Sequence, residues 1–586
     1  MLPIAVEDIA RIEVTRGPDS ASYGPNSMLA IINIITLHPQ DSDGVSAVLG
    51  VGTERQRRLH SRVSTSFGTT SATLSLSSEF NGGFDSFRSD GDASSARSDP
   101  SGHDSARATR LSYSSETRFT PHTKLAVRAT YVEGKNDSPF TSAYEGFQDR
   151  KLHNYYLSTL MTTSFSGSHQ LQIHASRSNY SKREEWTACY PRAAYMPELF
   201  ALYSANPTYA NAVALGKMPS GGSASDDLLA IAAIKAIRSL GANALTPACG
   251  TVNGNLVQSR DDMELQDTYV VSDTLRFVSG FGVRRNSATS ESYLGGTRSD
   301  TILRAFMHAE YKPAATVLIN AGLYADRSSD SASSAAPRLG VNWHLTPSQT
   351  VRLSYSKGTR APDLVERYGD LSYTLKPFSP IPGNPNPRFF QSAKVTDSNA
   401  VRHEVNKSLE LGYLLNVPAY GLILDAKLFN EELTDLVSQG VTVANFPPNN
   451  ANSVRLSGAE VQATFSLSPA SNGFVSYSYL SNHDATTLVE RTQYARHSGA
   501  IGLAHQFGGG LSVAGSYAGA SADTVGGSSY GRLDLVVSKH FTPRTYASLR
   551  LSRLDNPVVA YLRTTSIGQS QFDRRARVYV EFGTRF

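Results

Sequence analysis

From about residue 45 to the end of the chain, apolar and polar residues alternate in short segments separated by Gly, Asn, Asp, Ser and Pro. In residues 123–132, one face of the segment carries Leu, Val, Ala and Tyr, and the other face carries Lys, Arg and Thr. The same alternation recurs in residues 301–311, 421–428 and 532–539. A repeat of two residues is the repeat of a β-strand, because successive side chains point to opposite faces. The pattern therefore predicts an all-β fold.

The two unlike faces of these strands favour a transmembrane β-barrel. An apolar outer face suits lipid, and a charged inner face suits a water-filled lumen. Roughly twenty segments are recognisable, and bacterial barrels have an even number of strands, so we predict an antiparallel barrel of about 22 strands. The alternative is a soluble all-β array, whose strands are usually roughly 3–10 residues long, whereas many of these segments are longer.

The connections between the predicted strands are unequal in length. Residues 345–350 and 540–544 are tight turns, and short turns on one side with long loops on the other are typical of outer-membrane barrels. Within the longest connection, residues 226–240 predict a helix with Ser225 or Asp226 as its cap. The long connections span about residues 81–107, 181–262, 363–404 and 432–455.

Composition supports this class and excludes others. Hydrophobic residues are 40% of the 586 residues and charged residues only 18%, while Tyr and Phe together number 52, which excludes a disordered chain. No run of about 18 apolar residues exists, so a bundle of membrane helices is excluded. The net charge of +4 is too small for a nucleic-acid partner. Neither an HExxH motif nor a GxSxG motif in a suitable context occurs, and we expect no enzyme.

The chain has two cysteines, Cys189 and Cys249, and both lie in the longest connection. Two cysteines are too few for a disulfide framework, and they lack CxxC spacing. A disulfide between them would close roughly 60 residues and remove about 4 kcal/mol of chain entropy from the open state. An oxidising compartment would allow that bond.

The first 42 residues have a different pattern from the rest. Residues 9–36 read IARIEVTRGPDSASYGPNSMLAIINIIT. Residues 31–36 are apolar almost without alternation, which predicts a strand buried on both faces. Such a strand belongs to a globular unit, and we place that unit inside the barrel lumen.

This N-terminal stretch resembles the end of the plug domain of TonB-dependent outer-membrane receptors. The family pattern is close to E-R-I-E-V-x-R-G-P-x-S-x-x-Y-G-x-x-A-x-G-G-V-I-N-I-I-T. The chain departs from it at Leu29-Ala30, where the family commonly has a Gly pair. Residues 337–343, 351–362, 408–413 and 457–460 also resemble stretches of these receptors, and the final Phe586 resembles their assembly signal. The matching plug residues include Glu13, Gly17, Pro18, Tyr23, Gly24 and Asn33.

The resemblance implies a partial plug domain over residues 1–42 and a transmembrane barrel with long extracellular loops over residues 43–586. It implies a monomer in the bacterial outer membrane, surrounded by outer-membrane lipid and energised by the TonB complex of the inner membrane. The expected activity is uptake of a ferric siderophore or a similar scarce chelate. Cobalamin, haem or oligosaccharide uptake and a passive porin are the alternatives.

The resemblance also implies roles for individual residues. In the family, the arginine of the RGP motif meets acidic residues of the barrel wall, which here predicts that Arg16 pairs with Glu410 and Glu460. The alternative is that these are ordinary lumen charges solvated by water. Aromatic and basic loop residues are the candidates for ligand contact: Arg183, Trp186, Tyr190, Tyr373, Phe389 and Phe390.

Three weaker features complete the sequence picture. No cofactor is expected, although the acidic stretch from Asp85 to Asp104 could hold Ca²⁺ if it is not simply a solvated loop. Residues 359–362 and 384–387 resemble signatures of haem receptors, but no His lies between them. Residues 1–10 lack the features of a signal peptide. The resemblance therefore implies an N-terminally incomplete receptor, without its TonB box and the larger part of its plug.

Overall fold

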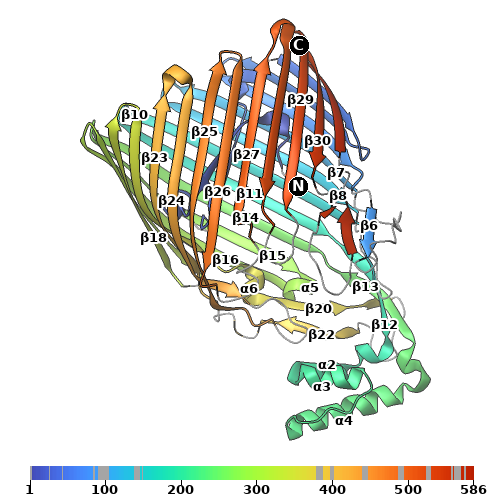
Figure 1. Cartoon of the computed structure of the whole chain (residues 1–586). Coiled ribbons are helices and arrows are strands. Elements are labelled where there is room, and N and C mark those ends of the chain that lie inside the picture. The colour runs from blue at the N-terminus through green and yellow to red at the C-terminus, as the bar shows by residue number, and fades with distance from the viewer. Residues whose placement is uncertain are drawn as a thin grey trace.

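The chain forms a closed β-barrel of 22 antiparallel strands, as the computed structural model in Figure 1 shows. Consecutive strands pair along the chain, and β33 (Ala576–Arg585) closes the ring against β3 (Gly44–Gly52). The prediction of an antiparallel β-barrel of about 22 strands is confirmed. The structure describes residues 3–24, 27–42, 44–83, 86–89, 105–137, 145–147, 149–330, 332–377, 387–395, 397, 401–438, 446–485, 494–522, 529–555, 558–559, 569–572 and 576–586.

The barrel strands are long enough to cross a bilayer at a tilt, and most exceed ten residues. Between β3 and β33 the ring contains β4 (Arg57–Phe67), β5 (Thr70–Asn81), β7 (Ala106–Thr120), β8 (Thr123–Asn136), β10 (Arg150–Ser166), β11 (His169–Arg183), β14 (Leu256–Ser272), β15 (Leu275–Ser290), β16 (Gly296–Ala314), β17 (Val317–Ser328), β18 (Ser334–Thr346), β19 (Gln349–Arg360), β23 (Glu404–Val417), β24 (Leu422–Ser438), β25 (Asn449–Ser468), β26 (Ser471–His483), β27 (His497–Gln506), β28 (Leu511–Ala520), β29 (Tyr530–Thr542) and β30 (Thr545–Leu554).

The two ends of the barrel differ as the sequence predicts. At one end the strands are joined by short turns, such as residues 121–122 and 347–348. At the other end, which we call the long-loop end, the connections include residues 184–255 and 361–403. In Figure 1 the short turns lie at the top, and the long connections lie at the bottom. Smaller elements occupy the long connections: β6 (Ser86–Ser89), β9 (Glu145–Phe147), α5 (Glu291–Leu294), α6 (Leu364–Tyr368), β20 (Asp370–Thr374), β21 (Lys376–Pro377), β22 (Arg388–Lys394), β31 (Val558–Val559) and β32 (Gln569–Phe572).

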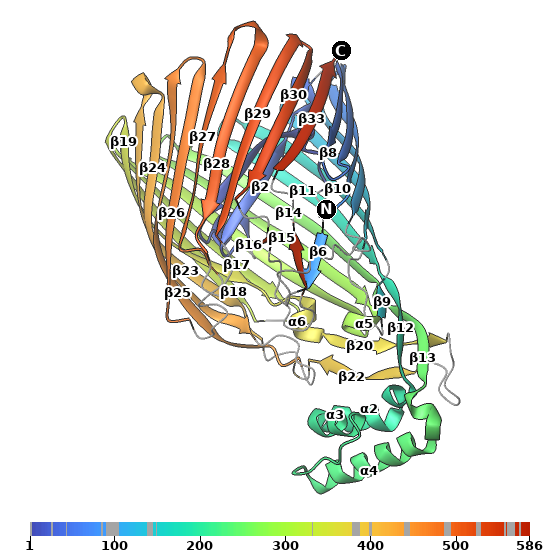
Figure 2. The ribbon, with the colours of Figure 1, turned by 45° about the vertical axis from the view of Figure 1, so that its right-hand side comes forward.

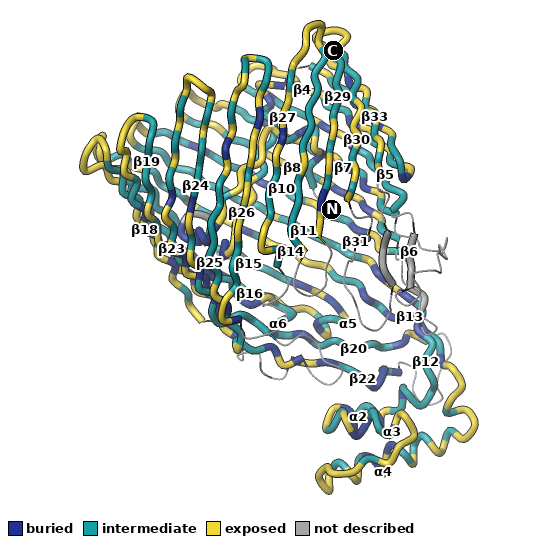
Figure 3. Tube along the Cα trace, in the orientation of Figure 1, coloured by how far each residue is buried: buried dark blue, intermediate teal, exposed yellow. Residues whose placement is uncertain are grey.

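Burial across the barrel wall is the inverse of that in a soluble protein. In β16, Leu303 and Met307 are 46% and 54% exposed, whereas Arg304 between them is only 6% exposed. Figure 3 shows the same alternation of exposed and less exposed positions along many strands. A soluble protein places its large apolar side chains inside. The wall therefore has the apolar outer face and polar inner face that a bilayer and a water-filled lumen require.

A group of helices lies beyond the long-loop end (Figure 1). It stands on a hairpin of β12 (Glu185–Pro191) and β13 (Pro247–Asn253), and we call residues 185–253 the helical loop unit. Among the described residues, no helix is both long and apolar enough to cross a membrane. The helices of this unit are α2 (Pro197–Ala205), α3 (Pro207–Ala214) and α4 (Ala224–Ser239).

The sequence predicts one of these three helices. The helix expected over residues 226–240 is α4, but its cap is Ser223, not Ser225 or Asp226. Ser223 accepts a hydrogen bond from the Asp226 backbone, and the Asp226 side chain accepts one from the Ser223 backbone. This capping box fixes the earlier start of the helix. Both α2 and α3 begin with a proline at the start of the helix, which is a common helix-start signal in sequences.

The N-terminal segment, residues 3–42, forms a two-stranded antiparallel sheet of its own. The sheet pairs β1 (Ile9–Arg16) with β2 (Ala30–Thr36), and α1 (Ser20–Tyr23) lies between them. Figure 2 shows β2 within the outline of the barrel. The expectation that β2 is buried on both faces is wrong, because Ile32 is 67% exposed. Only β1 pairs with β2, and among the described residues nothing covers the face that carries Ile32.

Candidate functional site

The N-terminal segment is fastened to inward-facing side chains on two distant parts of the barrel wall. Residues before and after its hairpin contact β4, β5 and β7, and the turn between its strands contacts β16 to β25. Strand β18 follows β4 by ten successive pairings in the ring of 22, so the two contact regions lie almost opposite each other. The segment therefore crosses the lumen.

The first contact region, which we call the β4–β5 anchor, centres on a buried carboxylate. Asp8 Oδ1 lies 3.1 Å from His60 Nε2, and the Ser75 hydroxyl donates to Asp8 Oδ2 over 2.6 Å. Arg62 adds a guanidinium 3.4 Å away. Beside this group, Glu7 and Arg58 form an ion pair at 2.8 Å. Burial alone would raise the pKa of Asp8, but hydrogen bonds from His60 and Ser75 and the charge of Arg62 outweigh burial and lower that pKa.

We expect the β4–β5 anchor to weaken in acid. Because the pKa of Asp8 is lowered by docking, its contribution is complete above the ordinary value of 3.8 and is lost as the pH falls through the lowered value. A fluorophore on a cysteine placed at exposed Val6 should gain mobility over that acid range. Asp8→Asn should give the mobile state at neutral pH, because an amide cannot replace the charge.

Asp41 supplies the matched control for this acid transition. It is an exposed carboxylate on the same segment, so Asp41→Asn should leave the transition unchanged. An acid transition that persists in Asp8→Asn would assign it to another group and contradict the prediction.

The second contact region, the β16–β25 anchor, contains the predicted charge cluster. Arg16 Nη1 lies 2.7 Å from Glu460 Oε2. Lys427 Nζ lies 3.4 Å from the same oxygen and 3.5 Å from Glu410 Oε1. The expected pairing of Arg16 with both carboxylates therefore has a different form: Arg16 contacts Glu460, and Lys427 links Glu460 to Glu410.

Lys427 is the member of this cluster that sequence reasoning missed as a partner. Lys427 and Glu460 are direct cross-strand neighbours in the β24–β25 pair. The alternation in residues 421–428 places Lys427 on the charged face, but only the register between strands brings it to Glu460. Its side chain is 8% exposed, so the two carboxylates keep a buried counter-charge independent of the N-terminal segment.

Glycine at position 17 is required by the close approach of Glu410. Gly17 has a φ of +93°, a conformation that residues with a side chain rarely adopt. A Cβ built on Gly17 would overlap Glu410 Oε1. Pro18, the next motif residue, is buried and fixes the direction in which the chain leaves the turn. The RGP motif thus combines a charge for Glu460 with a backbone that fits under Glu410.

The rest of the β16–β25 anchor is built from polar contacts along one arc of the wall. Asp19 forms an ion pair with Arg338 on β18. The Thr359 backbone N–H donates to the Ser20 hydroxyl over 3.1 Å. At the far side of the turn, the Asn406 amide donates to the Met28 carbonyl over 2.9 Å, and Asn406 is fully buried. Beside these polar contacts, the Met28 side chain packs in a small apolar cluster on β24 and β25.

The remaining plug-motif residues lie in the hairpin and its turn. Glu13 and Asn33 are direct partners in the β1–β2 pair, and the Asn33 amide donates to Glu13 Oε2 over 3.2 Å. Gly24 has a φ of +82° and lies against the ring of Tyr324 on β17. Tyr23 is the last residue of α1. These residues shape the segment itself, while Arg16 and Gly17 contact the charge cluster of the wall.

The helical loop unit shares a hydrophobic core with residues of the connection between β19 and β23, and this core contains several of the predicted ligand residues. Trp186, Phe389 and Phe390 are 3%, 9% and 5% exposed. Tyr190 and Tyr373 are partly buried and pack against the same core. The structure thus uses these aromatic side chains for packing, whereas the sequence predicts them as ligand contacts. The core also contains Tyr195, Leu199, Leu202, Tyr203, Tyr209, Ala210, Val213, Ala230, Ala233, Ala248, Val252 and Leu375.

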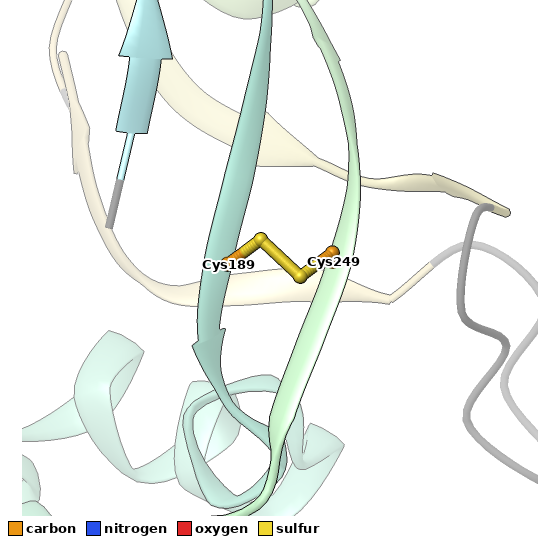
Figure 4. Close-up of a disulfide and its surroundings, with 2 residues drawn as sticks. All are labelled: Cys189 and Cys249. Atoms are coloured by element: carbon orange, nitrogen blue, oxygen red, sulfur yellow. A yellow bond between two sulfur atoms is a disulfide. The ribbon is translucent and has the colours of Figure 1, made fainter. Parts of the chain in front are cut away.

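A disulfide joins Cys189 on β12 to Cys249 on β13 (Figure 4). The two residues are direct partners in the β12–β13 pair and are separated by 60 residues in sequence. The bond closes the helical loop unit at its base. It is the pairing considered for the only two cysteines of the chain.

The other predicted sites have simpler outcomes. Arg183 is exposed at the end of β11, directly opposite Lys151 on β10. Asp85 and Asp104, which bound the proposed Ca²⁺ stretch, lie outside the described residues. Within the described part of the chain, no group of three or more His, Cys, Asp or Glu side chains is placed to hold a metal ion.

The barrel has a recognised sequence family. Residues 50–556 match the family described as TonB dependent receptor-like, beta-barrel. Over 71 residues, the chain is also 34% identical to the vitamin B12 transporter BtuB of Vibrio vulnificus. That second match spans 12% of this chain and only 10% of the relative's length.

Solved structures resemble the whole chain. The siderophore receptor PirA of Pseudomonas aeruginosa has a TM-score of 0.64 at 14% identity, with 99% of this chain and 87% of that chain covered. The ferric-catecholate import receptor Fiu of E. coli K12 gives 0.69 at 12% identity, covering 99% and 88%. The FrpB iron transporter of Neisseria meningitidis gives the same four values. At these identities the likeness establishes the fold alone.

Proposed function

Since this chain belongs to the TonB-dependent receptor family through its β-barrel, we propose that it takes up a ferric siderophore or a similar scarce chelate across the bacterial outer membrane. Members of this family are transporters and not enzymes, and their 22-strand barrels lie in that membrane. The outer membrane has no energy source of its own. Uphill transport therefore needs a partner, which for this family is the TonB complex of the inner membrane.

The observation that carries the proposal is the way the N-terminal segment crosses the lumen. We infer that residues 1–42 are the C-terminal part of a plug domain and residues 43–586 the transporting barrel. Both anchors are built mainly from ion pairs and hydrogen bonds, and a pull on the segment can exchange these for contacts with water. The apolar part is the small cluster around Met28. An apolar interface of the same size would resist such a pull, because its separation exposes hydrophobic surface. A gate that opens and recloses is therefore better held by ion pairs and hydrogen bonds than by a large apolar interface.

Energised uptake of an iron chelate tests this proposal. The full chain is expressed in the outer membrane of a strain that lacks its own siderophore receptors, and accumulation of ⁵⁵Fe-labelled chelates is measured. We expect accumulation above the external concentration that disappears when TonB is deleted or the proton gradient is collapsed. Uptake that persists without TonB and saturates at the external concentration would instead indicate a passive porin.

Cobalamin uptake is a second candidate because of the short match to BtuB. The same strain, tested with ⁵⁷Co-labelled cobalamin, separates the two ligands. We expect TonB-dependent uptake of iron chelates and none of cobalamin. Uptake of cobalamin without uptake of iron chelates would support a TonB-dependent transporter whose ligand is cobalamin.

A further inference from the structure

A groove lies on the outer, lipid-facing wall of the barrel, across β10, β11, β14 and β15, and has a volume of about 360 Å³. Its floor is mostly apolar and consists of direct cross-strand partners. Met263 in this floor is 54% exposed, as expected of a side chain that faces lipid. The floor can therefore accept a hydrocarbon chain. Its residues are Thr159, Ala175, Met263 and Val283.

A row of charged side chains borders the groove on the side of the long-loop end. Arg177, Asp261 and Arg285 are direct partners in the β11–β14 and β14–β15 pairs. Arg177 lies 3.6 Å from Asp261, and their side chains are 58% and 49% exposed. Arg285 is exposed on the other side of Asp261. Two guanidinium groups thus share one carboxylate, and this arginine row keeps a net positive charge.

The height of the arginine row in the wall matches the outer surface of a bilayer. Arg285 lies ten residues from Leu275, which begins β15 at the short-turn end. At roughly 3.3 Å per residue and a strand tilt of roughly 40°, these residues span about 25 Å along the barrel axis. The apolar band of such barrels is also about 25 Å tall, and their long loops face the outside of the cell. The arginine row therefore lies among the headgroups of the outer leaflet.

Small polar side chains continue the same face beyond the arginine row. The next row toward the long-loop end lies two residues further along each strand. Its hydroxyl and amide groups can donate and accept hydrogen bonds, as sugar hydroxyls do. The outer face thus changes over three rows from apolar to cationic and then to uncharged and polar. From β11 to β16, the polar row contains Asn179, Ser259, Ser287 and Ser299.

We propose that this groove binds a phosphorylated glycolipid of the outer leaflet, with a phosphate on Arg177 and Arg285 and an acyl chain on the apolar floor. A guanidinium donates paired N–H groups that match phosphate oxygens, and the net charge of the row attracts an anion. The polar row beyond the arginines then meets the sugar of the glycolipid. This inference concerns the outer wall and does not depend on which solute the barrel transports.

Native mass spectrometry of the purified full chain in detergent, titrated with lipid, tests the inference. The probe is bis-phosphorylated lipid A, and phosphatidylglycerol is the anionic phospholipid for comparison. Arg285→Gln should weaken binding of lipid A about tenfold, or about 1.4 kcal/mol, because Arg177 and Asp261 then remain as a neutral pair. Arg285→Lys should lie between Arg285→Gln and the unaltered chain, since it keeps the charge but loses the paired N–H groups.

A second variant, Ala175→Phe, tests the floor of the groove without changing any charge. The larger side chain occupies the space of the acyl chain, so binding of lipid A should weaken about fourfold for each methylene that is kept out of the groove. Unchanged binding in Ala175→Phe would contradict the placement of the acyl chain. Heat-dependent migration of each variant in gel electrophoresis shows that its barrel has folded.

Arg455→Gln is the matched control, because Arg455 also lies on the outer face. Its direct partner Glu432 is ten residues from the short-turn end of β24, which places the pair at the height of Arg285. Arg455 is 50% exposed and lies 3.6 Å from Glu432 and 3.4 Å from Asp484. One guanidinium here serves two carboxylates, the reverse of the arrangement around Asp261. We therefore expect Arg455→Gln to change the affinity for lipid A by less than about twofold.

Three results would overturn the inference. Equal losses of affinity in Arg285→Gln and Arg455→Gln would indicate a general effect of charge. Binding of lipid A that Arg285→Gln leaves unchanged would place the lipid elsewhere on the wall. Binding of phosphatidylglycerol as tight as that of lipid A, with the same dependence on Arg285, would show a site for phospholipids and not for a glycolipid.

Discussion

Charge reversal at Arg16, by Arg16→Glu, is expected to loosen the N-terminal segment and raise the passage of large antibiotics through the lumen. In the structure, Arg16 contacts Glu460, and Lys427 contacts both Glu410 and Glu460. The reversal removes the guanidinium that lies 2.7 Å from Glu460, puts a carboxylate on the same side of the cluster, and leaves Lys427 as the remaining cation of the cluster. Breaking a fully buried ion pair costs about 3–5 kcal/mol. Arg16 is 41% exposed, so we expect about 2 kcal/mol, or about thirtyfold in the open population.

Arg11 provides the control for this experiment. It lies on the same strand, is 63% exposed and pairs locally with Glu13, so that Arg11→Glu makes the same change of charge without touching the wall. Sensitivity to vancomycin and the conductance of the protein in planar bilayers should rise for Arg16→Glu and stay near the starting value for Arg11→Glu. Equal permeability of the two variants would show that Arg16 does not hold the segment.

The strands of the barrel could be predicted because their environment alternates as locally as their sequence does. Lipid and lumen lie on opposite sides of a single wall. Each strand therefore alternates apolar residues that face lipid with polar residues that face the lumen. The face assignments made for residues 301–311 and 421–428 hold in the structure, where Leu303 and Leu428 are exposed and Arg304 and Lys427 are buried. No long-range information is needed for this result.

The parts that sequence reasoning missed all depend on what another segment does. The apolar pattern of β2 shows that both of its faces can be buried, but it cannot show that a partner covers Ile32. The aromatic residues Trp186 and Phe390 are far apart in sequence, and only the fold of the helical loop unit brings them into one core. The role of Lys427 likewise depends on the register between β24 and β25, which a single strand does not contain.

The residues of the charge cluster could be predicted from the sequence, but the pairing between them could not. Its members Arg16, Glu410 and Glu460 were found through the resemblance of short motifs, because a motif carries the position of a residue in the family's fold. The motif did not carry the detailed pairing, since that depends on side chains particular to this chain. Lys427 is such a side chain, and it contacts both Glu410 and Glu460.

Loss of the disulfide is expected to open the helical loop unit while the barrel stays folded. Replacing both cysteines, by Cys189→Ser with Cys249→Ser, removes a cross-link over 60 residues. In the chain-entropy treatment such a link is worth about 4 kcal/mol, or about a thousandfold in the ratio of closed to open forms. A unit of this length, residues 185–253, rarely gains more than about 3–5 kcal/mol from a core, so the disulfide contributes a large share of its stability.

Trypsin measures this opening, because Lys235 and Arg238 lie in α4 and are cleaved only when the helix unfolds. Cleavage there should be faster by about two to three orders of magnitude in the double variant, provided that opening is in rapid equilibrium. Reduction of the unaltered protein should give the same cleavage pattern and should have no effect on the variant. Equal cleavage rates with and without the disulfide would contradict the prediction and assign the stability of the unit to its core.

The same double variant distinguishes packing from ligand contact for the aromatic residues. Trp186 and Phe390 are buried in the closed unit, so they can reach a chelate only after the unit opens. If they serve as packing residues, chelate affinity should fall or stay constant in the double variant, because opening adds disorder at the entrance. If they bind the chelate directly, opening removes a barrier, and affinity should rise. We expect no rise, because both rings are almost completely buried and each packs against neighbouring aromatic rings.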